Sequence, residues 1–346
     1  MADPCAAAAR ALGVDFPLVQ AGMGGIATPA LAAAVSGAGA LGTVALYKME
    51  AEGARAVVAD TAARTSSTFG VNVIPEVAGD ALLRRQVDAA LAALPDRRSA
   101  VFNTYGLPPR WLAAALRGSP YRLLVQVGSA DDAARAAELG AQVIALQGVE
   151  AGGHLLGRRG VRDLVAETAP QDLGVPLLAA GGLHDGRQLA ELIRLGAGGW
   201  LMGTAFIATP ESGAHPDYRT ALISAGPAST VITDRFDIGW PGRRHRVLRS
   251  PVTESRTRLP SSFIAWTDVA GGRQPVFRGS AAAPTAEAQG RVDEMARYAG
   301  TGAAWVNTVA PAADLVARIR AEYLAASGGR TIRTDVERPS EGAVSI

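Results

Sequence analysis

The sequence predicts a (β/α)8 TIM barrel, an α/β fold in which eight parallel strands form a ring inside a layer of helices. Three observations support this prediction: eight short apolar runs, amphipathic segments between them, and glycine or amide residues where the runs end. The chain has 346 residues, of which 48% are hydrophobic and 19% charged. That length can bury one large α/β core, alone or with a smaller second domain.

The eight apolar runs are the predicted strands. Each is almost continuously apolar, which is typical of parallel strands buried on both faces. They span residues 16–23, 40–46, 69–74, 100–106, 122–128, 141–148, 175–182 and 198–206. Segments of helical period separate them, for example "DGRQLAELIRLG" at 185–196. A doubly wound open sheet is the alternative, but that fold does not predict a count of eight.

The regular alternation ends at residue 208, so the barrel is predicted over 10–208. Residues 209–283 are rich in Arg, Pro, Ser and Thr and contain Trp240 and Trp266. We predict that they form an inserted lid or a small second domain.

Helical periodicity returns at 285–300 and 311–327. Residues 284–327 are therefore predicted to supply C-terminal helices that close the barrel. The polar tail 328–346 is predicted to be mobile.

Composition argues against several classes of function. The net charge of +2 gives no general reason to expect nucleic acid or an anionic membrane as a partner. Cys5 is the only cysteine, so an intramolecular disulfide or a multi-thiolate metal site is excluded. No signal peptide and no apolar stretch of about 18 residues is found, so a cytoplasmic protein is expected. No metal site is predicted, because the four histidines are scattered: His154, His184, His215 and His245.

Glycines and amide side chains gather at the predicted strand ends, where a barrel carries its chemistry. Amides both donate and accept hydrogen bonds, so such a ring suits a flat heteroaromatic ligand with a mixed edge, such as an isoalloxazine. The residues concerned are Gly22, Met23, Asn72, Asn103, Tyr105, Gln126, Gln147, Gly181, Gly182, Gly203 and Thr204.

The last two predicted strands indicate a phosphate site. "AAGG" (179–182) precedes a helix, and "MGTAF" (202–206) follows the next strand. Glycine lets backbone N–H groups approach an anion, and barrels commonly bind phosphate at these two loops. A phosphate-bearing cofactor is therefore expected, although glycines could also simply relieve crowding in tight turns.

His154 is the candidate acid–base residue, because it follows Gly152 and Gly153 on the loop after the sixth predicted strand. An ordinary imidazole titrates near pH 6.5 and can exchange a proton at neutral pH. The alternative is a structural histidine bonded to a loop carbonyl. Glu150 could orient the loop or the imidazole, or be solvated.

Six other residues have open roles. Tyr105 and Tyr298 could line the pocket or belong to the core or the rim. Arg243, Arg244 and His245 could meet an anionic substrate, although a solvated basic loop is the simpler interpretation. Lys48, the only lysine, is interpreted as a solvated loop residue rather than a Schiff-base lysine.

Several stretches together resemble the nitronate monooxygenases, formerly called 2-nitropropane dioxygenases. They are "VQAGMGGIATPALAAAVSGAGALGTV", "FGVNVI", "LLVQVGSADDAARAAELGAQVIALQGVEAGGH", "VPLLAAGGLHDGRQLAELIRLGAGGWLMGTAF" and "YAGTGAAWV". The resemblance covers residues 14–212 and, more thinly, 230–325. Flavin-dependent quinone reductases and enoyl-acyl-carrier-protein reductases share the same frame.

The resemblance implies FMN in a TIM barrel, with Gly22 and Met23 beside the flavin ring. The family often has a lysine at the end of strand 5, where this chain has Gln126. A cation there would stabilise the reduced anionic ring, and an amide offers only a dipole. The other implied FMN contacts are Asn72, Gln147, Gly152, Gly181, Gly182, Leu201, Met202, Gly203 and Thr204.

The implied reaction is oxidation of a small alkyl nitronate by O2. His154 would remove the proton next to a nitro group or, when protonated, stabilise the nitronate. The products would be a carbonyl compound and an oxidised nitrogen anion. Two alternatives stay open: an FMN-dependent NAD(P)H reductase of a quinone or enoyl thioester, and a non-redox barrel that binds a phosphorylated metabolite. The sequence does not fix the oligomeric state, and a homodimer is possible.

Overall fold

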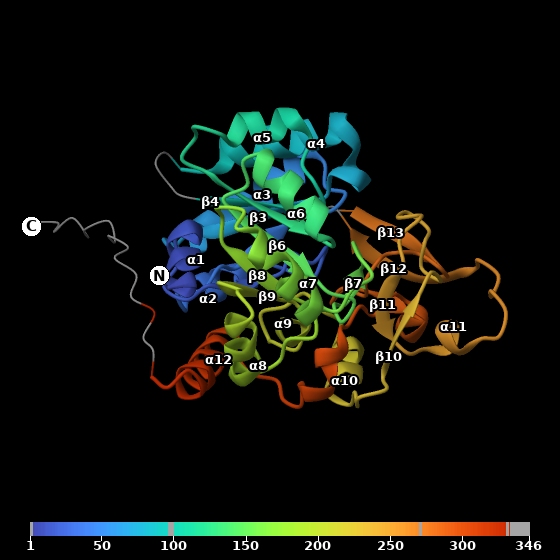
Figure 1. The fold of residues 1–346 in the computed structure, drawn as a ribbon. Helices are drawn as coiled ribbons and strands as arrows, with labels where there is room; N and C mark the ends of the chain where they lie inside the picture. The colour runs from blue at the N-terminus through green and yellow to red at the C-terminus, as the bar shows by residue number, and fades with distance from the viewer. Residues whose placement is uncertain (1–2, 96–99, 270–271, 330–331, 333–346) are drawn as a thin grey trace, which may run out of the picture.

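Eight parallel strands form the barrel in this computed structural model, which describes residues 3–95, 100–269, 272–329 and 332 (Figure 1). The strand order is β1-β9-β8-β6-β5-β4-β3-β2. A parallel bridge between Val19 and Leu41, just before β2, joins the two ends of the sheet. The strands are β1 (Leu18–Gln20), β2 (Thr43–Ala45), β3 (Phe69–Val73), β4 (Ala100–Tyr105), β5 (Arg122–Val127), β6 (Val143–Gln147), β8 (Leu177–Ala180) and β9 (Gly199–Met202).

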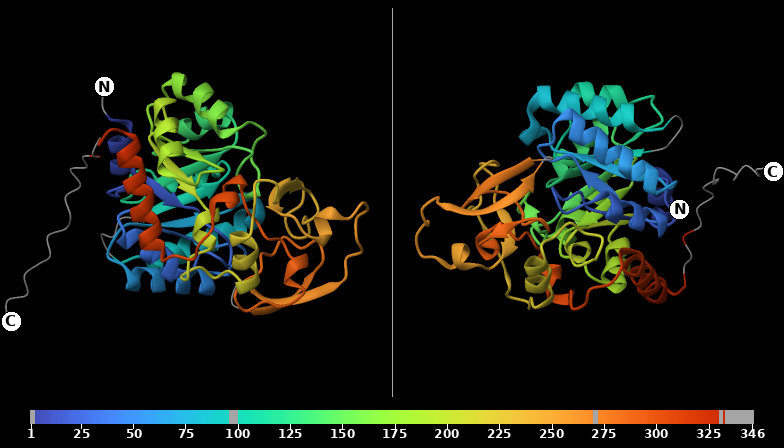
Figure 2. Two further views of the ribbon diagram at one scale, coloured as in Figure 1. Left: turned by 90° about the horizontal axis from the view of Figure 1, so that it is seen from below. Right: turned by 180° about the vertical axis from the view of Figure 1, so that it is seen from behind.

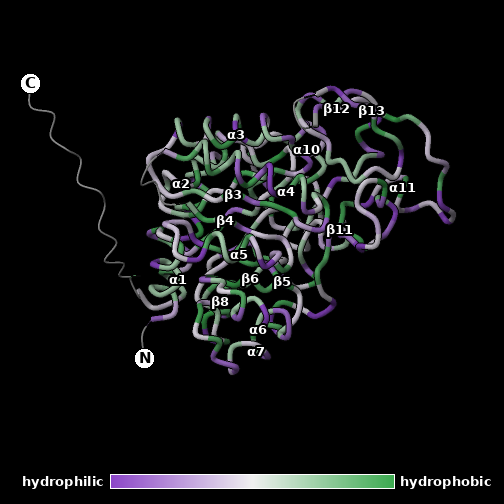
Figure 3. The backbone as a smooth tube through the Cα atoms, turned by 90° about the horizontal axis from the view of Figure 1, so that it is seen from above, coloured by the Kyte–Doolittle hydropathy of each residue, from purple (hydrophilic) through white to green (hydrophobic). Residues whose placement is uncertain are grey.

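Each of the eight predicted runs contains one of these strands, so the predicted fold class is confirmed. All but one of the strand residues are buried, as the near-continuous apolar runs require. Figure 3 shows hydrophobic segments gathered along the strands, with hydrophilic turns on the outside. Phe16 packs on Trp200 of β9 with ring centroids 5.4 Å apart, and both rings also contact Tyr323 of the C-terminal helix.

Helices cover the outside of the barrel. They are α1 (Pro4–Leu12), α2 (Pro29–Gly37), α3 (Ala51–Arg64), α4 (Pro75–Ala93), α5 (Arg110–Leu116), α6 (Ala130–Glu138), α7 (Val161–Thr168), α8 (Gly186–Arg194) and α12 (Ala312–Ala326). Side-chain caps explain where some begin: Ser129 accepts a hydrogen bond from the Asp132 N–H at α6, and Asp185 accepts one from the Gln188 N–H at α8. None of the described helices is long and apolar enough to cross a membrane.

The helix α12, predicted from the periodicity at 311–327, completes the helical layer. It packs against α8 on one side and α2 on the other (Figure 2). This is the position of the helix that would follow the eighth strand. Between β9 and α12 the chain forms a long inserted segment.

This inserted segment between β9 and α12, called the lid below, lies beside the carboxyl ends of the strands (Figure 1). It supplies β10 and β11 to one three-stranded sheet, β10-β11-β7, and all three strands of a second, β13-β12-β14. Two short elements lie instead in loops of the barrel: β7 (Gly153–His154) and η1 (Ala169–Gln171). The elements of the inserted segment are α9 (Thr204–Ile207), α10 (Pro216–Ile223), β10 (Thr230–Thr233), β11 (His245–Leu248), α11 (Pro251–Glu254), β12 (Phe263–Val269), β13 (Gly272–Phe277), β14 (Gln289–Gly290), η2 (Val292–Glu294) and η3 (Thr301–Trp305).

The helix predicted over 285–300 is wrong. This segment forms β14, the short 3-10 turn η2 and irregular backbone, and β14 pairs with β12. The apolar residues Ala288, Val292 and Met295 have helical spacing but pack on Ile264 of the small sheet. Gly290 has a φ of +132°, and a side chain there would collide with the Ile264 carbonyl. The predicted mobile tail lies, except for 328–329 and 332, outside the described residues.

Candidate active site

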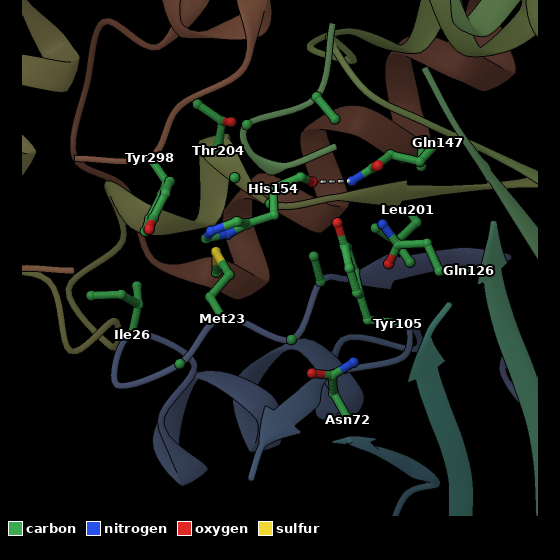
Figure 4. A pocket seen from close by; sticks show the side chains of 18 of the residues that line it. Met23, Ile26, Asn72, Tyr105, Gln126, Gln147, His154, Leu201, Thr204 and Tyr298 are labelled. Atoms are coloured by element: carbon green, nitrogen blue, oxygen red, sulfur yellow. Dashed lines mark hydrogen bonds between the residues drawn. The ribbon is translucent and has the colours of Figure 1, made fainter. Parts of the chain in front are cut away.

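A large cavity opens at the carboxyl ends of the barrel strands, with about 1180 Å³ of open space including its mouth. The structure brings all thirteen predicted site residues to its lining: Gly22, Met23, Asn72, Gln126, Gln147, Gly152, His154, Gly181, Gly182, Leu201, Met202, Gly203 and Thr204. Figure 4 shows His154, Met23 and Tyr298 pointing into this shared space.

The amide side chains of Gln147 and Asn72 make different hydrogen bonds. Both ends of Gln147 hold the following loop: its Nε2 donates to the His154 carbonyl at 3.0 Å, and its Oε1 accepts from the Leu156 N–H at 2.8 Å (Figure 4). Asn72 donates to the Asn103 carbonyl at 3.2 Å. Asn103, which the sequence placed among the strand-end amides, is fully buried and does not line the cavity.

The predicted phosphate loops lie together at one end of the cavity, after β8 and β9. A side chain at Gly182 would come within 2.7 Å of Thr301 Oγ1 and 2.8 Å of Glu150 Cβ. Gly203 differs, since a Cβ there would meet only Ala21 and Met23 at 3.4 and 3.5 Å. A methyl at Gly203 is thus tolerated by the protein, and further atoms would extend into the cavity.

His154 is part of the two-residue strand β7, which pairs with β11 so that His154 lies opposite His245. Strand β11 of the lid thereby fixes the backbone of His154, the candidate acid–base residue. The His154 side chain is only 6% exposed, and its Nε2 is buried without a hydrogen-bond partner. The Trp240 indole stacks on the imidazole at 3.8 Å, with 16° between the planes. Such an unpartnered buried atom in a cavity is free to meet a ligand.

Burial lowers the pKa of His154 to about 2. The nearby positive or protonatable groups His245, Arg243 and Lys48 lower this pKa further. The His245 ring lies 5.0 Å away and the Tyr298 ring 5.4 Å away, and no carboxylate is among the residues that line the cavity. The imidazole is therefore neutral at physiological pH and can accept a proton, while the protonated form is disfavoured before an anion binds.

The sequence model of the nitronate monooxygenase family matches residues 7–322. The chain belongs to this family. A nitronate monooxygenase of Pseudomonas aeruginosa is 33% identical over 89% of this chain and 96% of its own length. Among solved structures, a nitroalkane oxidase from Streptomyces ansochromogenes superposes with a TM-score of 0.71 and 29% identity over 92% of this chain and 99% of its own. FabK from Thermotoga maritima gives 0.72 and 25% over 91% and 94%.

Membership in the nitronate monooxygenase family confirms the resemblance and makes the chain an enzyme, a flavin-dependent oxidoreductase. In this chain Gln126 lines the cavity at the position where the resemblance suggests a lysine. No Lys or Arg is among the cavity's lining residues, and Lys48 is exposed, with its ammonium 5.2 Å from the Tyr47 ring centroid. The cavity is thus lined by neutral groups.

The open roles of the other candidates are largely settled by their contacts. Glu150 accepts a hydrogen bond from the Val161 N–H at the start of α7, so it caps a helix and does not orient His154. His184 stacks on Trp305 at 3.8 Å, outside the cavity. Tyr105 and Tyr298 both line the cavity.

The basic residues of the lid are not solvated as a group. Arg243 forms an ion pair with Glu76 at 2.6 Å, and His245 is fully buried. His215 caps α10 through its Nδ1. Arg244 offers its carbonyl to the Leu155 N–H, which ties the lid to the loop after β7.

Sequence reasoning missed several lining residues, above all Tyr47 and Trp240. Trp240 comes from the lid and reaches the cavity only through the fold. The pattern "GWPG" (239–242) marks a turn, but a turn does not say where its tryptophan packs. Tyr47 lies two residues after the end of β2, so a prediction that extended its strand-end list past the second strand would have included it.

We predict that the ligand-free protein loses stability in acid because of His154. Below pH 6.5 the unfolded chain binds a proton that the folded chain, with its lowered pKa, does not bind. The free energy of unfolding is therefore unaffected by His154 above pH 6.5 and falls by about 1.4 kcal/mol per pH unit below it. At pH 5 the loss is about 2 kcal/mol. Urea unfolding of the wild type and of His154→Gln at pH 7 and pH 5 measures this. Equal losses in both proteins would contradict the prediction.

Proposed function

We propose that this enzyme binds FMN in the cavity and uses O2 to oxidise alkyl nitronates, with His154 as its acid–base residue. The observation that carries the proposal is the buried, unpartnered Nε2 of His154, in a cavity whose lining has no other histidine and no carboxylate. A neutral imidazole there can take the proton next to a nitro group. The resulting imidazolium would lie beside a nitronate anion, whose charge offsets the cost of burying the cation.

The residues of the cavity fit a flavin nucleotide. Gly203 leaves open space at the paired glycine loops, which suits a phosphate approached by backbone N–H groups. Gly22 lets the Asn72 side chain lie against its backbone, because a Cβ added at Gly22 would be only 2.4 Å from the Asn72 Cβ. When bound, the flavin would supply the oxidising equivalent for the nitronate and be reoxidised by O2. The residues proposed to hold FMN are Gly22, Met23, Asn72, Gln126, Gln147, Gly152, Gly181, Gly182, Leu201, Met202, Gly203 and Thr204.

The protein's own contribution to the reaction is exclusion of water and placement of one base. Tyr105 and Tyr47 each have a hydroxyl that is buried without a partner. Burial raises the pKa of Tyr47 to about 12 and that of Tyr105 further, so both remain neutral hydrogen-bond donors. Such donors can meet the oxygen atoms of a nitro group or nitronate.

A reductase is the second candidate, because flavin-dependent enoyl-acyl-carrier-protein reductases share the frame of the quoted sequence stretches, and FabK superposes as well as the nitroalkane oxidase does. Anaerobic titration separates the two. We expect ethyl nitronate to bleach the visible flavin spectrum and NADH or NADPH to leave it unchanged. Rapid bleaching by a nicotinamide alone would overturn the oxidase proposal and support the reductase. The third candidate, a non-redox barrel, is set aside by family membership.

Location and assembly are separate proposals that the sequence suggested. We propose a cytoplasmic homodimer that binds no nucleic acid. Cell fractionation and sedimentation at several protein concentrations test the first two properties. A gel-shift assay with duplex DNA and RNA tests the third.

A further inference from the structure

The loop between β10 and β11 brings an aromatic side chain onto the candidate catalytic base. Trp240 lies on this loop and is 8% exposed. Besides stacking on His154, its ring meets Tyr47 in a stacked arrangement at 5.9 Å and Tyr105 edge-on at 5.3 Å. The indole therefore covers one face of the imidazole.

Glu76, in the first turn of α4, holds this loop on the barrel. Its Oε1 accepts a hydrogen bond from the Trp240 indole N–H at 2.5 Å. Its two oxygens also accept from Arg243 at 2.6 and 3.1 Å. Two-atom pairing of an arginine with a carboxylate fixes orientation as well as distance. A single carboxylate of the barrel thus positions both sides of the turn that carries the indole.

Trp240 is packed among aromatic and aliphatic side chains. Tyr105, Trp240 and Ala281 form one buried cluster, and Tyr47, Ile74, Val77 and Leu156 pack against it. Five of these seven residues line the cavity; Val77 and Leu156 do not. The indole is the largest of these groups and the only one with a ring stacked on the imidazole at van der Waals distance. Its size therefore sets how much room remains next to the base.

We propose that Trp240, held on His154 by Glu76, is the residue that restricts this enzyme to small substrates and keeps its acid–base imidazole away from water. The size limit rests on the proposed nitronate chemistry, whereas the shielding of His154 does not. A pocket wall of this kind discriminates by the volume it denies to larger substrates. Trp240 acts on the reaction through His154 and the shape of the pocket, so it is a positioning and specificity residue.

The first test compares two nitronates of different size, those of nitroethane and phenylnitromethane. In Trp240→Ala we expect the ratio of kcat/KM for the larger over the smaller substrate to rise about tenfold or more. Trp240→Phe retains a flat ring and should stay within about threefold of the wild type. Glu76→Ala should shift the ratio in the same direction as Trp240→Ala. Trp266→Ala, a control on an exposed lid tryptophan, should leave it unchanged.

The second test is independent of turnover. Nitrogen NMR of the histidine rings, assigned with His154→Gln, follows protonation of His154 between pH 8 and pH 5. We expect the wild-type ring to stay neutral over this range and the ring in Trp240→Ala to titrate within it, because water then reaches the imidazole. Trp240→Phe should behave as the wild type does.

The outcomes are distinguishable. An unchanged size ratio in folded Trp240→Ala would overturn the size limit, and an unchanged His154 titration would overturn the shielding. If the wild type oxidises neither nitronate, the proposed function fails, and the titration alone then decides whether Trp240 shields the base. An unchanged ratio and titration in Glu76→Ala would remove Glu76 from the proposal.

Discussion

Replacing His154 with alanine is expected to lower kcat/KM for a neutral nitroalkane by about 10²- to 10⁴-fold, the usual contribution of a positioned acid–base group. The flavin should remain bound, because the other predicted FMN contacts are unchanged. The loss of activity is expected because the unpartnered Nε2 is buried in a cavity whose lining has no other histidine and no carboxylate. Steady-state kinetics together with the visible spectrum of the purified variant measure both quantities.

A preformed nitronate gives a second test, because it shows whether proton removal is the role of His154. A preformed nitronate has already lost the proton that His154 would remove, so His154→Ala should retain much more activity on the nitronate than on the nitroalkane. Equal losses on both substrates would indicate that His154 stabilises the anion instead. Unchanged turnover of the nitroalkane would remove it from the mechanism. The control His215→Asn, which keeps a capping side chain at α10, should behave as the wild type.

The pH dependence of the wild type bears on the same residue. The base form of His154 is present throughout pH 5–8, because burial holds its pKa far below this range. The kcat/KM profile for a neutral nitroalkane should accordingly show no loss of activity near pH 6.5 that can be assigned to His154.

Much of the barrel is predictable from sequence because strand burial is a local signal. Each apolar run contains a strand, since a parallel strand covered on both faces must be apolar along its whole length. The strand-end residues then meet in one cavity as a consequence of topology alone. This is why the sequence places Asn72 and Thr204, far apart in the chain, at one site.

The lid is less predictable because its contacts are not periodic. The spacing of Ala288, Val292 and Met295 is helical, yet pairing of β14 with β12 outweighs it. The stacking of Trp240 on His154 joins two loops that are 86 residues apart, and no local pattern encodes it. The lowered pKa of His154 follows from that burial, so the sequence could suggest only an ordinary imidazole.

The predicted phosphate loops can be tested by Gly203→Val, which should release the flavin while the protein stays folded. The Gly203 backbone has a φ of −118°, which any residue can adopt, and a Cβ there makes only ordinary contacts with Ala21 and Met23. The two methyl groups of valine would extend into the cavity where we propose the phosphate. Flavin affinity should fall about tenfold or more, the cost of one unfavourable contact of 1.4 kcal/mol or greater.

The choice of Gly203 over Gly182 follows from their surroundings. Gly182 has a φ of +70°, and its added Cβ would collide with Thr301 and Glu150, so valine there would disturb the fold itself. Gly226→Val is the matched control, since nothing lies within 4 Å of the added Cβ in that lid turn. The ratio of flavin to protein absorbance reports occupancy, and far-UV circular dichroism reports folding. A Gly203→Val protein that is folded and fully loaded with flavin would show that the phosphate lies elsewhere.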